Sequence, residues 1–340
     1  MKVLRIHGKG DVRLHDEAVP EPSHDEELVR VTAVGLCGSD LHWYTESGIG
    51  DLGLVRPLVL GHEAGGVIAE GSRRGQRVAI DPAIPCGACE HCLAGHQHFC
   101  LKLRFAGDGV TDGFLREYVA WPSESLVPVP DSIGDSDAAM LEPLGVAIHA
   151  NRLIEIRPGD TVGVFGCGPI GLFLVQLARA NGASKIVATD LHQHRLDAAR
   201  EMGATNTHLV AGGEERKALL AAVGGRLLDA TFEAAGEDDA LDTAIALAYP
   251  ASTVVVVGIP SVNRTSFTPS TARRKGLTIK LSRRMNRVYP AAIRAVEAGL
   301  VDLRSVVTAT HPIEEFDTAF SAAARREGLK VVIRPSHGAD

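Results

Sequence analysis

Four cysteines lie within one short stretch of the chain, at Cys86, Cys89, Cys92 and Cys100. Thiolates spaced in this way on a turning loop can surround one tetrahedral Zn²⁺ at about 2.3 Å. Because four protein ligands leave no open position, we expect a structural zinc that holds the loop and takes no part in catalysis. The alternative, a disulfide cluster, is disfavoured because the chain does not start with an apolar run typical of secretion.

A second set of metal-ligand side chains is more widely spaced: Cys37, His62, Glu63 and Glu142. Three protein ligands and an open position suit a zinc that polarises an alcohol oxygen. Neighbours on an extended strand point in opposite directions, so Glu63 is either a ligand, where the backbone turns, or a group that supports His62. Glu142 either ligates the metal or holds a water bound to it.

A glycine motif, G-x-G-x-x-G, starts at Gly166, directly between an apolar strand and a helical pattern. Such glycines let the backbone approach a pyrophosphate at the positive end of a helix. Asp190 ends the next strand, where a carboxylate accepts ribose hydroxyls and repels a 2′-phosphate, which favours NAD over NADP. Arg195 either flanks the adenine or pairs with a phosphate. The expected cofactor contacts are Gly166, Gly168, Pro169, Ile170, Gly171, Asp190, Arg195, Val257, Gly258 and Ile259.

The elements that position these residues change in character near residue 150. The first part has short alternating runs, such as 27–33 and 76–80, that predict a β-rich domain. From residue 160 strands alternate with helices, which predicts a doubly wound parallel sheet. The predicted strands are 161–165, 185–190, 229–234, 253–257, 277–281 and 330–334, and the predicted helices are 169–180, 195–202 and 290–298. The segment 154–160 is the predicted boundary loop.

The length of 340 residues suggests two domains, and the net charge of −7 argues against a nucleic-acid or anionic-membrane partner. The most apolar stretch, Thr253–Ile259, is far too short to cross a bilayer. Because charged residues run through the first ten positions, we expect a cytoplasmic protein without a signal peptide.

Taken in order, these motifs resemble those of the zinc-containing medium-chain dehydrogenases. Within that family the chain is most similar to the polyol branch of sorbitol, xylitol and L-iditol dehydrogenases, with L-idonate dehydrogenase close by. The segments 37–44 and 142–144 carry that closer match. The resemblance implies a GroES-like β-barrel catalytic domain at 1–149 and 285–340, and a Rossmann domain at 150–284. It also implies a catalytic zinc on Cys37, His62 and Glu63, with Glu142 near the metal and contacting the substrate.

The implied reaction is the NAD-dependent oxidation of a secondary hydroxyl of a polyol to a ketose, by hydride transfer from a zinc-bound alkoxide. Ser39 and His42 match the family's proton relay to solvent. The expected substrate contacts are Trp43, Tyr44, Glu142 and Arg284. Two Zn²⁺ per chain are expected, and the family implies a homo-oligomer, either a dimer or a tetramer.

Other substrates stay open: a sugar acid of the L-idonate type, L-threonine or a simple secondary alcohol. An arginine at 284 would suit a sugar-acid carboxylate. A non-catalytic dinucleotide-binding protein is the remaining alternative, although such a relative would be expected to lose its metal ligands.

The chain departs from the family pattern in four places. Gln76 stands where the family usually has an aspartate, and the preceding loop, 70–74, is short. Trp43 stands where sorbitol enzymes commonly have tyrosine, and Arg284 is followed by Met285, where the branch often has an aromatic residue. The last two departures concern the substrate end of the site.

Overall fold

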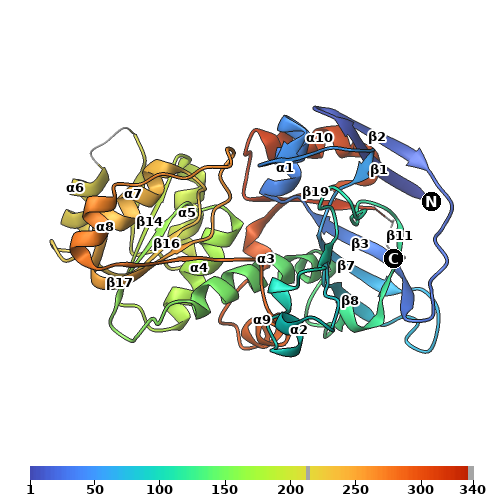
Figure 1. The fold of residues 1–340 in the computed structure, drawn as a ribbon, viewed down its shortest axis with the longest axis horizontal. Helices are drawn as coiled ribbons and strands as arrows, with labels where there is room; N and C mark the ends of the chain where they lie inside the picture. The colour runs from blue at the N-terminus through green and yellow to red at the C-terminus, as the bar shows by residue number, and fades with distance from the viewer. Residues whose placement is uncertain (212–214, 336–340) are drawn as a thin grey trace. The chain divides into compact units, whose positions relative to one another are not determined.

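A computed structural model describes residues 1–211 and 215–335 of the chain (Figure 1). The chain divides into two compact units. The first consists of Met1–Pro143, Tyr289–Ile293 and Asp302–Asp340, and the second of Leu144–Val288 and Arg294–Val301. The division therefore falls after Pro143 and after Val288, whereas the sequence predicts domain boundaries at 149/150 and 284/285, which stay predictions.

The first unit is built on a seven-stranded mixed sheet in the order β12-β8-β7-β3-β20-β19, with β11 paired to β3 as well. Only β19 and β20 run parallel to each other. The predicted strands at 27–33, 76–80 and 330–334 are confirmed. The strands are β3 (Glu26–Gly35), β7 (Glu63–Ile68), β8 (Arg77–Ile80), β11 (Tyr118–Pro122), β12 (Leu126–Pro128), β19 (Val307–Pro312) and β20 (Lys330–Arg334).

Smaller elements complete this unit. The strands β1 (Lys2–Gly8), β2 (Asp11–Asp16) and β6 (Leu58–Val59) form a three-stranded antiparallel sheet. Two short pairs are β4 (Gly48–Ile49) with β5 (Leu52–Gly53), and β9 (Ala83–Ile84) with β10 (Arg104–Phe105). The helices are α1 (Gly38–Glu46), α2 (Glu90–Leu93) and α10 (Phe316–Ala324), with 3₁₀ turns at Gln97–Phe99, Ser123–Ser125, Arg304–Val306 and Ile313–Glu315.

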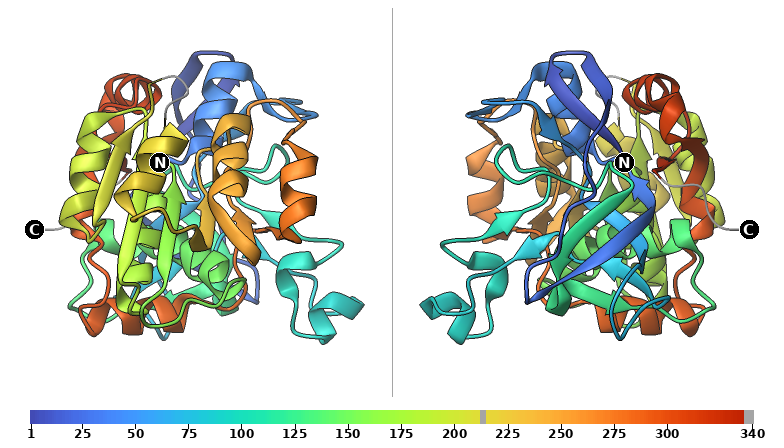
Figure 2. Two further views of the ribbon diagram at one scale, coloured as in Figure 1. Left: turned by 90° about the vertical axis from the view of Figure 1, so that its left-hand side faces the viewer. Right: turned by 90° about the vertical axis from the view of Figure 1, so that its right-hand side faces the viewer.

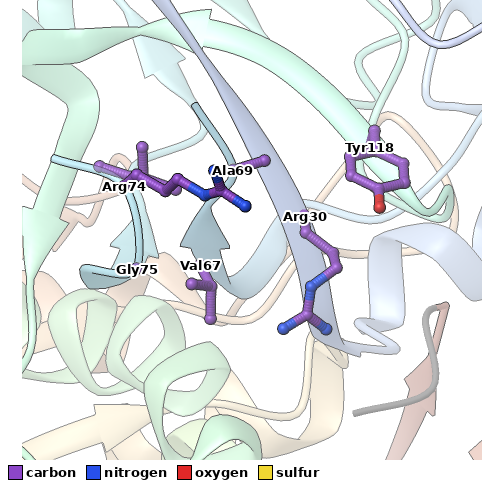
Figure 3. Close-up of a pocket in the computed structure, with 7 residues that line it drawn as sticks. Arg30, Val67, Ala69, Arg74, Gly75 and Tyr118 are labelled. Atoms are coloured by element: carbon purple, nitrogen blue, oxygen red, sulfur yellow. The ribbon is translucent and has the colours of Figure 1, made fainter. Parts of the chain in front are cut away.

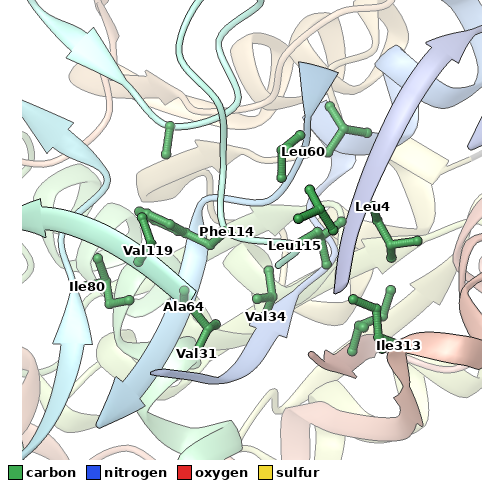
Figure 4. Close-up of a cluster of buried hydrophobic side chains, with 14 of the residues drawn as sticks. Leu4, Val31, Val34, Leu60, Ala64, Ile80, Phe114, Leu115, Val119 and Ile313 are labelled. Atoms are coloured by element: carbon green, nitrogen blue, oxygen red, sulfur yellow. The ribbon is translucent and has the colours of Figure 1, made fainter. Parts of the chain in front are cut away.

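The core of the first unit lies between these sheets (Figure 4). Val31 and Val34 on β3 and Ile80 on β8 are fully buried, as are Phe114 and Leu115 on the segment that precedes β11. Burial of branched and aromatic side chains on this scale is what fixes the strands that carry the polar residues described below.

Two helices include residues of both units. α3 (Asp135–Arg152) contains Pro143, and α9 (Tyr289–Glu297) begins one residue before Pro290. The sequence did not predict α3, because a proline inside a helix removes one backbone hydrogen bond and usually ends the element. Pro290 sits in the first turn of α9, where the missing N–H has no helical partner to lose.

The second unit has a six-stranded, fully parallel sheet in the order β15-β14-β13-β16-β17-β18. Numbered within the unit, this order is 3-2-1-4-5-6, so the predicted doubly wound sheet is confirmed. The strands are β13 (Thr161–Phe165), β14 (Lys185–Asp190), β15 (Asn206–Leu209), β16 (Leu228–Glu233), β17 (Ala248–Val256) and β18 (Thr278–Leu281).

Helices pack on both faces of this sheet (Figure 2). They are α4 (Pro169–Ala180), α5 (Gln193–Glu201), α6 (Glu215–Ala222), α7 (Asp238–Leu247) and α8 (Pro269–Lys275). The predicted bounds of β13, β14 and α4 are confirmed, since five buried residues in a row mark β13 and Pro169 opens α4. β17 starts five residues before its predicted start, and the sequence did not predict β15, α6 or α7. Among the described residues, no helix is both long and apolar enough to cross a membrane.

Candidate active site

Cys37, His62 and Glu63 come together in the first unit, with one ligand atom of each within 4.8 Å of the others. Cys37 caps the N-terminus of α1 directly after β3, and His62 and Glu63 stand at the start of β7. Pairing of β3 with β7 sets Gly35 opposite Glu63, and a Cβ at Gly35 would lie only 2.2 Å from Glu63 Oε2. The glycine therefore makes room for the carboxylate.

These three side chains fit a catalytic zinc. A thiolate, an imidazole and a carboxylate are a donor set that zinc enzymes use, and three ligands leave one position for substrate. The backbone at Gly61 has φ +88°, so the chain turns immediately before His62. The sequence left open whether Glu63 points toward the other two residues, and the structure brings all three together.

Asp40 holds the backbone on both sides of this cluster. The sequence contains no indication of a role for this residue. Its side chain is fully buried, and it accepts hydrogen bonds from the backbone N–H groups of Cys37 at 2.9 Å and Gly61 at 3.0 Å. It also lies 3.7 Å from His62 Nδ1. Burial alone would lower the pKa of His62, but the negative charges of Asp40 and Cys37 raise it well above its usual value.

Lys330 is the second residue that sequence reasoning missed. Its Nζ donates to Glu63 Oε1 at 2.8 Å, to Glu63 Oε2 at 2.7 Å and to the Leu36 carbonyl at 3.0 Å. Both side chains of this ion pair are buried. The only local signal was a lysine at the start of an otherwise apolar strand, β20.

Glu142 is buried in α3 but is not one of the three residues whose ligand atoms lie together. Burial raises its pKa to about 8, and the nearby negative charge of Glu63 raises it as well, while His62 and Lys330 lower it. Glu142 is therefore a buried carboxyl that lies close enough to the cluster to be affected by its charges.

Ser39 and His42 lie three residues apart on α1, which places them on the same face of that helix. Both are half-buried. Nδ1 of His42 is 3.1 Å from Glu46 Oε1, so the carboxylate orients the ring. The two residues predicted to form a relay therefore lie side by side on α1.

The predicted substrate residues lie in different surroundings. Trp43 is 1% exposed and part of the core, and its Nε1 has no hydrogen-bond acceptor within the part of the chain that the structure describes. The ring of Tyr44 packs on Phe320, with centroids 5.1 Å apart. Arg284 belongs to the second unit and holds φ +54°, a backbone conformation that is uncommon for a residue other than glycine.

The four clustered cysteines also come together, with their sulfur atoms within 4.8 Å of one another. Thiolates bound about 2.3 Å from one ion lie roughly 4 Å apart, so the arrangement fits a tetrahedral zinc. All six cysteines of the chain are free thiols. Hydrogen bonds from the backbone N–H groups of Cys92 and Leu101 lower the pKa of Cys89 to about 6, which favours the thiolate that a metal needs.

The glycine motif of the second unit has the predicted geometry between β13 and α4. Gly166 has φ +103°, and a Cβ there would lie 2.7 Å from the backbone N of Ala235. A Cβ at Gly171 would lie 1.9 Å from the Gly166 carbonyl oxygen, whereas nothing lies within 4 Å of one at Gly168. The first and last glycines are thus needed for packing. The middle one, with Pro169 and Ile170, leaves the start of α4 open to a phosphate.

Asp190 lies at the end of β14 beside this motif. Its Oδ2 accepts the N–H of Cys167 at 2.8 Å, its Oδ1 accepts the N–H of His192 at 2.9 Å, and Arg195 lies 3.9 Å away. The carboxylate therefore fixes the glycine loop and the turn that follows β14.

Glu233, at the end of β16, links the loops that carry the remaining predicted cofactor residues, and the sequence did not point to it. Its carboxylate accepts the N–H groups of Ala235 at 2.7 Å and Gly236 at 2.6 Å, and its carbonyl accepts those of Val257 and Gly258. A Cβ at Gly236 would lie 2.4 Å from the Ile259 carbonyl oxygen. The loops after β16 and β17 are therefore held in close contact at the carboxyl edge of the sheet, where doubly wound sheets bind their ligands.

Comparison with known proteins places these sites in a family context. Residues 23–131 match the alcohol dehydrogenase GroES-like domain, and residues 169–298 match the zinc-binding dehydrogenase domain. The chain is 34% identical to the sorbitol dehydrogenase of Bacillus subtilis over 99% of its own length and 98% of the relative.

Two solved structures have the same fold. The L-idonate 5-dehydrogenase of Escherichia coli K-12 has a TM-score of 0.89 at 27% identity and covers 98% of this chain and 97% of that one. A short chain alcohol dehydrogenase of Escherichia coli CFT073, complexed with NADH, has a TM-score of 0.90 at 29% identity. The match covers 98% of this chain and 99% of that one. These likenesses confirm the expected GroES-like domain and dinucleotide-binding domain.

Proposed function

Because this chain belongs to the zinc-binding dehydrogenase family, we propose that it oxidises a secondary hydroxyl of a polyol to a ketone, with NAD as the hydride acceptor. The observation that carries the proposal is the cluster of Cys37, His62 and Glu63, which supplies three ligands and leaves one position open. The similarity to a sorbitol dehydrogenase over nearly the whole chain supports a polyol as substrate.

We propose two zinc sites in each chain. One uses Cys37, His62 and Glu63, with Glu142 close by, and a zinc there would act as a Lewis acid that lowers the pKa of a substrate hydroxyl. The other uses Cys86, Cys89, Cys92 and Cys100 and would hold the lobe around α2 in place. The retained cluster of ligands argues against a non-catalytic dinucleotide-binding protein.

The proton released from the substrate hydroxyl needs a path out of the site. Ser39 and His42 share one face of α1, whose first residue follows Cys37, and Glu46 orients the His42 ring. In the proposed relay the Ser39 hydroxyl passes the proton on and His42 delivers it to water. Glu142, a buried carboxyl close enough to His62 and Glu63 to interact with their charges, is the proposed group that holds or donates a proton near the metal ligands.

A polyol offers several hydroxyls, and the proposed contacts for them are Trp43, Tyr44, Glu142 and Arg284. Arg284 holds a strained backbone conformation, a kind of outlier that is found preferentially at functional sites.

A sugar acid of the L-idonate type is the second candidate substrate. The guanidinium of Arg284 would pair with its carboxylate, and one structural neighbour is an L-idonate 5-dehydrogenase. A simple alcohol or L-threonine has no comparable support from the residues described.

The proposed cofactor is NAD rather than NADP. The Asp190 carboxylate is buried beside the open start of α4, where it would accept the ribose hydroxyls and repel a 2′-phosphate. One structural neighbour holds NADH.

We also propose that the protein is a homo-oligomer, a dimer or a tetramer. β18 is the outermost strand of the parallel sheet, and Leu281 at its end is 79% exposed. An exposed edge strand with an apolar side chain is suited to pairing with a second copy. Light scattering on Leu281→Asp and the parent protein tests this directly.

NADH formation by the zinc-loaded protein across a substrate panel tests the function. The panel contains sorbitol, xylitol, L-iditol, galactitol, L-idonate, L-threonine and 2,3-butanediol. Turnover confined to the polyols is expected, and turnover on L-idonate alone would favour the sugar-acid candidate. If no substrate of the panel gives NADH formation while two zincs and NAD are bound, the proposed substrate class is wrong.

A further inference from the structure

Two histidines meet on the antiparallel pair of β1 and β2 in the first unit, and neither belongs to a proposed zinc site (Figure 1). Nε2 of His7 lies 2.9 Å from Nε2 of His15, whereas the centroids of the two rings are 5.1 Å apart. Because the nitrogens are much closer together than the centroids, the two rings point their Nε2 atoms at each other. Both side chains are half-buried.

A β-bulge brings His7 to this position. The register of β1 on β2 shifts between Ile6 and Gly8, which makes His7 the extra residue of its strand. A bulge re-aims a side chain relative to the regular pleat. The backbone around it is fixed, because Ile6 is 1% exposed and the turn between the strands donates a hydrogen bond from Gly10 N to Tyr44 O at 2.8 Å. The two rings are therefore held in place by the fold.

The contact between the two rings is one that a metal ion can replace. Among residues 1–211 and 215–335, neither His7 nor His15 has a hydrogen-bond partner other than the second histidine. The hydrogen bond that they share needs a proton on one Nε2 and a lone pair on the other. When the donor ring carries its proton on Nδ1 instead, both Nε2 atoms offer lone pairs to the space between them. Metal binding then releases no proton and breaks only this one hydrogen bond.

The charges near the histidines leave room for a cation. Arg5 lies opposite Arg13, and each of these guanidinium groups is neutralised by a carboxylate. Arg5 donates to Glu17 at 2.6 Å, and Arg13 donates to both oxygens of Asp11 at 2.8 and 2.7 Å. Burial and the neighbouring charge of Arg13 lower the pKa of His7, which favours the neutral imidazole that a metal requires.

The distance between the two nitrogens indicates which ions fit. Imidazole nitrogens bind divalent metals at about 2.0 Å, so two ligands at a right angle are about 2.8 Å apart and two tetrahedral ligands about 3.3 Å apart. The observed 2.9 Å is closer to the right angle. Right angles between nitrogen ligands are typical of Cu²⁺ and Ni²⁺ in square-planar or tetragonal sites, and imidazole suits both ions.

The pocket of about 260 Å³ elsewhere on the first unit does not suit a cation (Figure 3). Its charged and hydroxyl groups come from Arg30, Arg74 and Tyr118, and none of the residues that line it is a histidine, a cysteine or an acid. Guanidinium groups have no lone pair to offer a metal and repel its charge. A cation is therefore expected at the histidine pair and not in this pocket.

We propose that His7 and His15 bind one Ni²⁺ or Cu²⁺ ion per chain, with water in its remaining coordination positions. The two ions share the required chemistry, namely two imidazole ligands at a right angle. The proposal does not depend on the proposed polyol chemistry, since none of the residues assigned to that chemistry takes part.

Calorimetric titration of the zinc-loaded protein with nickel chloride tests the proposal, with protein that carries no histidine tag. One Ni²⁺ per chain is expected to bind in addition to the zinc. His7→Gln and His15→Gln should each weaken binding by about a hundredfold, because the second imidazole of a pair acts at a high effective concentration. His24→Gln is the matched control, since the His24 side chain is 98% exposed and lies outside the pair, and it should bind Ni²⁺ as the parent does.

Two further measurements identify the ligands. Metal analysis after the titration should find the zinc content unchanged, and nickel that binds only by displacing zinc counts against the proposal. Electron paramagnetic resonance with one equivalent of Cu²⁺ should show coupling to two imidazole nitrogens in the parent and in His24→Gln, and to fewer in His7→Gln and His15→Gln. Thermal unfolding checks that each variant folds, and either single variant serves if the other does not.

The outcome that overturns the proposal is specific. It is overturned if the parent protein binds no Ni²⁺ beyond its zinc, since the two rings then share only their hydrogen bond. It is equally overturned if His7→Gln and His15→Gln bind Ni²⁺ as tightly as His24→Gln does.

Discussion

Lys330 binds both carboxylate oxygens of Glu63, at 2.8 and 2.7 Å, with both side chains buried. This ion pair joins β20 to the first residue of β7, and it turns the carboxylate into a fixed group beside Cys37 and His62. Lys330 is thus the residue that positions the Glu63 carboxylate.

Replacing Lys330 by methionine should therefore cost more stability than replacing an exposed lysine by methionine. Lys330→Met leaves a buried carboxylate without its counter-charge, and we expect the free energy of unfolding to fall by about 3–5 kcal/mol. Urea unfolding measures this, with Lys217→Met on the exposed surface of α6 as the matched control. Adding Glu63→Gln to Lys330→Met should restore part of the loss, because the uncompensated charge is then removed. An equal loss in the single and double variants would contradict the ion-pair explanation.

Removal of the Cys37 thiol should separate the two proposed zinc sites. Cys37→Ser is expected to bind one zinc per chain instead of two and to lose turnover by about a thousandfold or more, because one of three ligands is gone. Metal analysis by atomic emission gives the stoichiometry. Cys167→Ala, which changes a buried cysteine of the other unit, should keep both zincs. Two zincs in Cys37→Ser would rule out Cys37 as an essential ligand.

Neutralising Asp190 should weaken the preference for NAD. Asp190→Asn keeps one oxygen to accept a backbone N–H but removes the charge that repels a 2′-phosphate. We expect the KM for NAD to rise about tenfold and the ratio of NAD to NADP turnover to fall by a larger factor. Steady-state kinetics with both cofactors measures the change, and Asp197→Asn on the exposed face of α5 is the control. If the ratio of NAD to NADP turnover does not change, Asp190 does not determine cofactor specificity.

Asp81 should make the protein less stable as pH rises. Burial raises the pKa of its carboxyl to about 6, so between its ordinary pKa near 3.8 and pH 6 the folded chain binds a proton that the unfolded chain has lost. The free energy of unfolding therefore falls through this window and stays lower above it. Asp81→Asn should be more stable than the parent by about 1–3 kcal/mol at pH 7 and equal to it near pH 4. Urea unfolding from pH 4 to 7 measures this, with the exposed Asp131→Asn as the control. The explanation would be contradicted if the free energy of unfolding depended on pH in the same way in both variants.

The second unit was largely predictable because its signals are local. The apolar run of β13, the glycine turn and Pro169 follow one another along the chain and fix a strand, a phosphate loop and a helix. The four-cysteine cluster is local in the same way. By contrast, Lys330 and Glu63 are 267 residues apart, and a lysine in an apolar strand has no spacing that points to a partner.

Two other features escaped prediction for physical reasons. Pro143 lies inside α3, where sequence rules expect a helix to end, so the helix that carries Glu142 was not seen. Asp40 resembles any acidic residue in the first turn of a helix, and only the fold shows that it reaches Gly61 as well as Cys37. Tertiary contacts, not local propensity, decide both.

The order in which the chain is made also matters for the first unit, which is interrupted by the second. Glu63 is synthesised early, but Lys330 follows only after all of Leu144–Val288 and Arg294–Val301 has been added. A nascent chain can therefore complete the doubly wound sheet while the first unit still lacks β19, β20 and α10. Until those elements arrive, the carboxylate of Glu63 lacks the ammonium group of Lys330, and closing so long a loop is entropically costly. We expect the metal-binding cluster to be the last part of this protein to reach its native form on the ribosome.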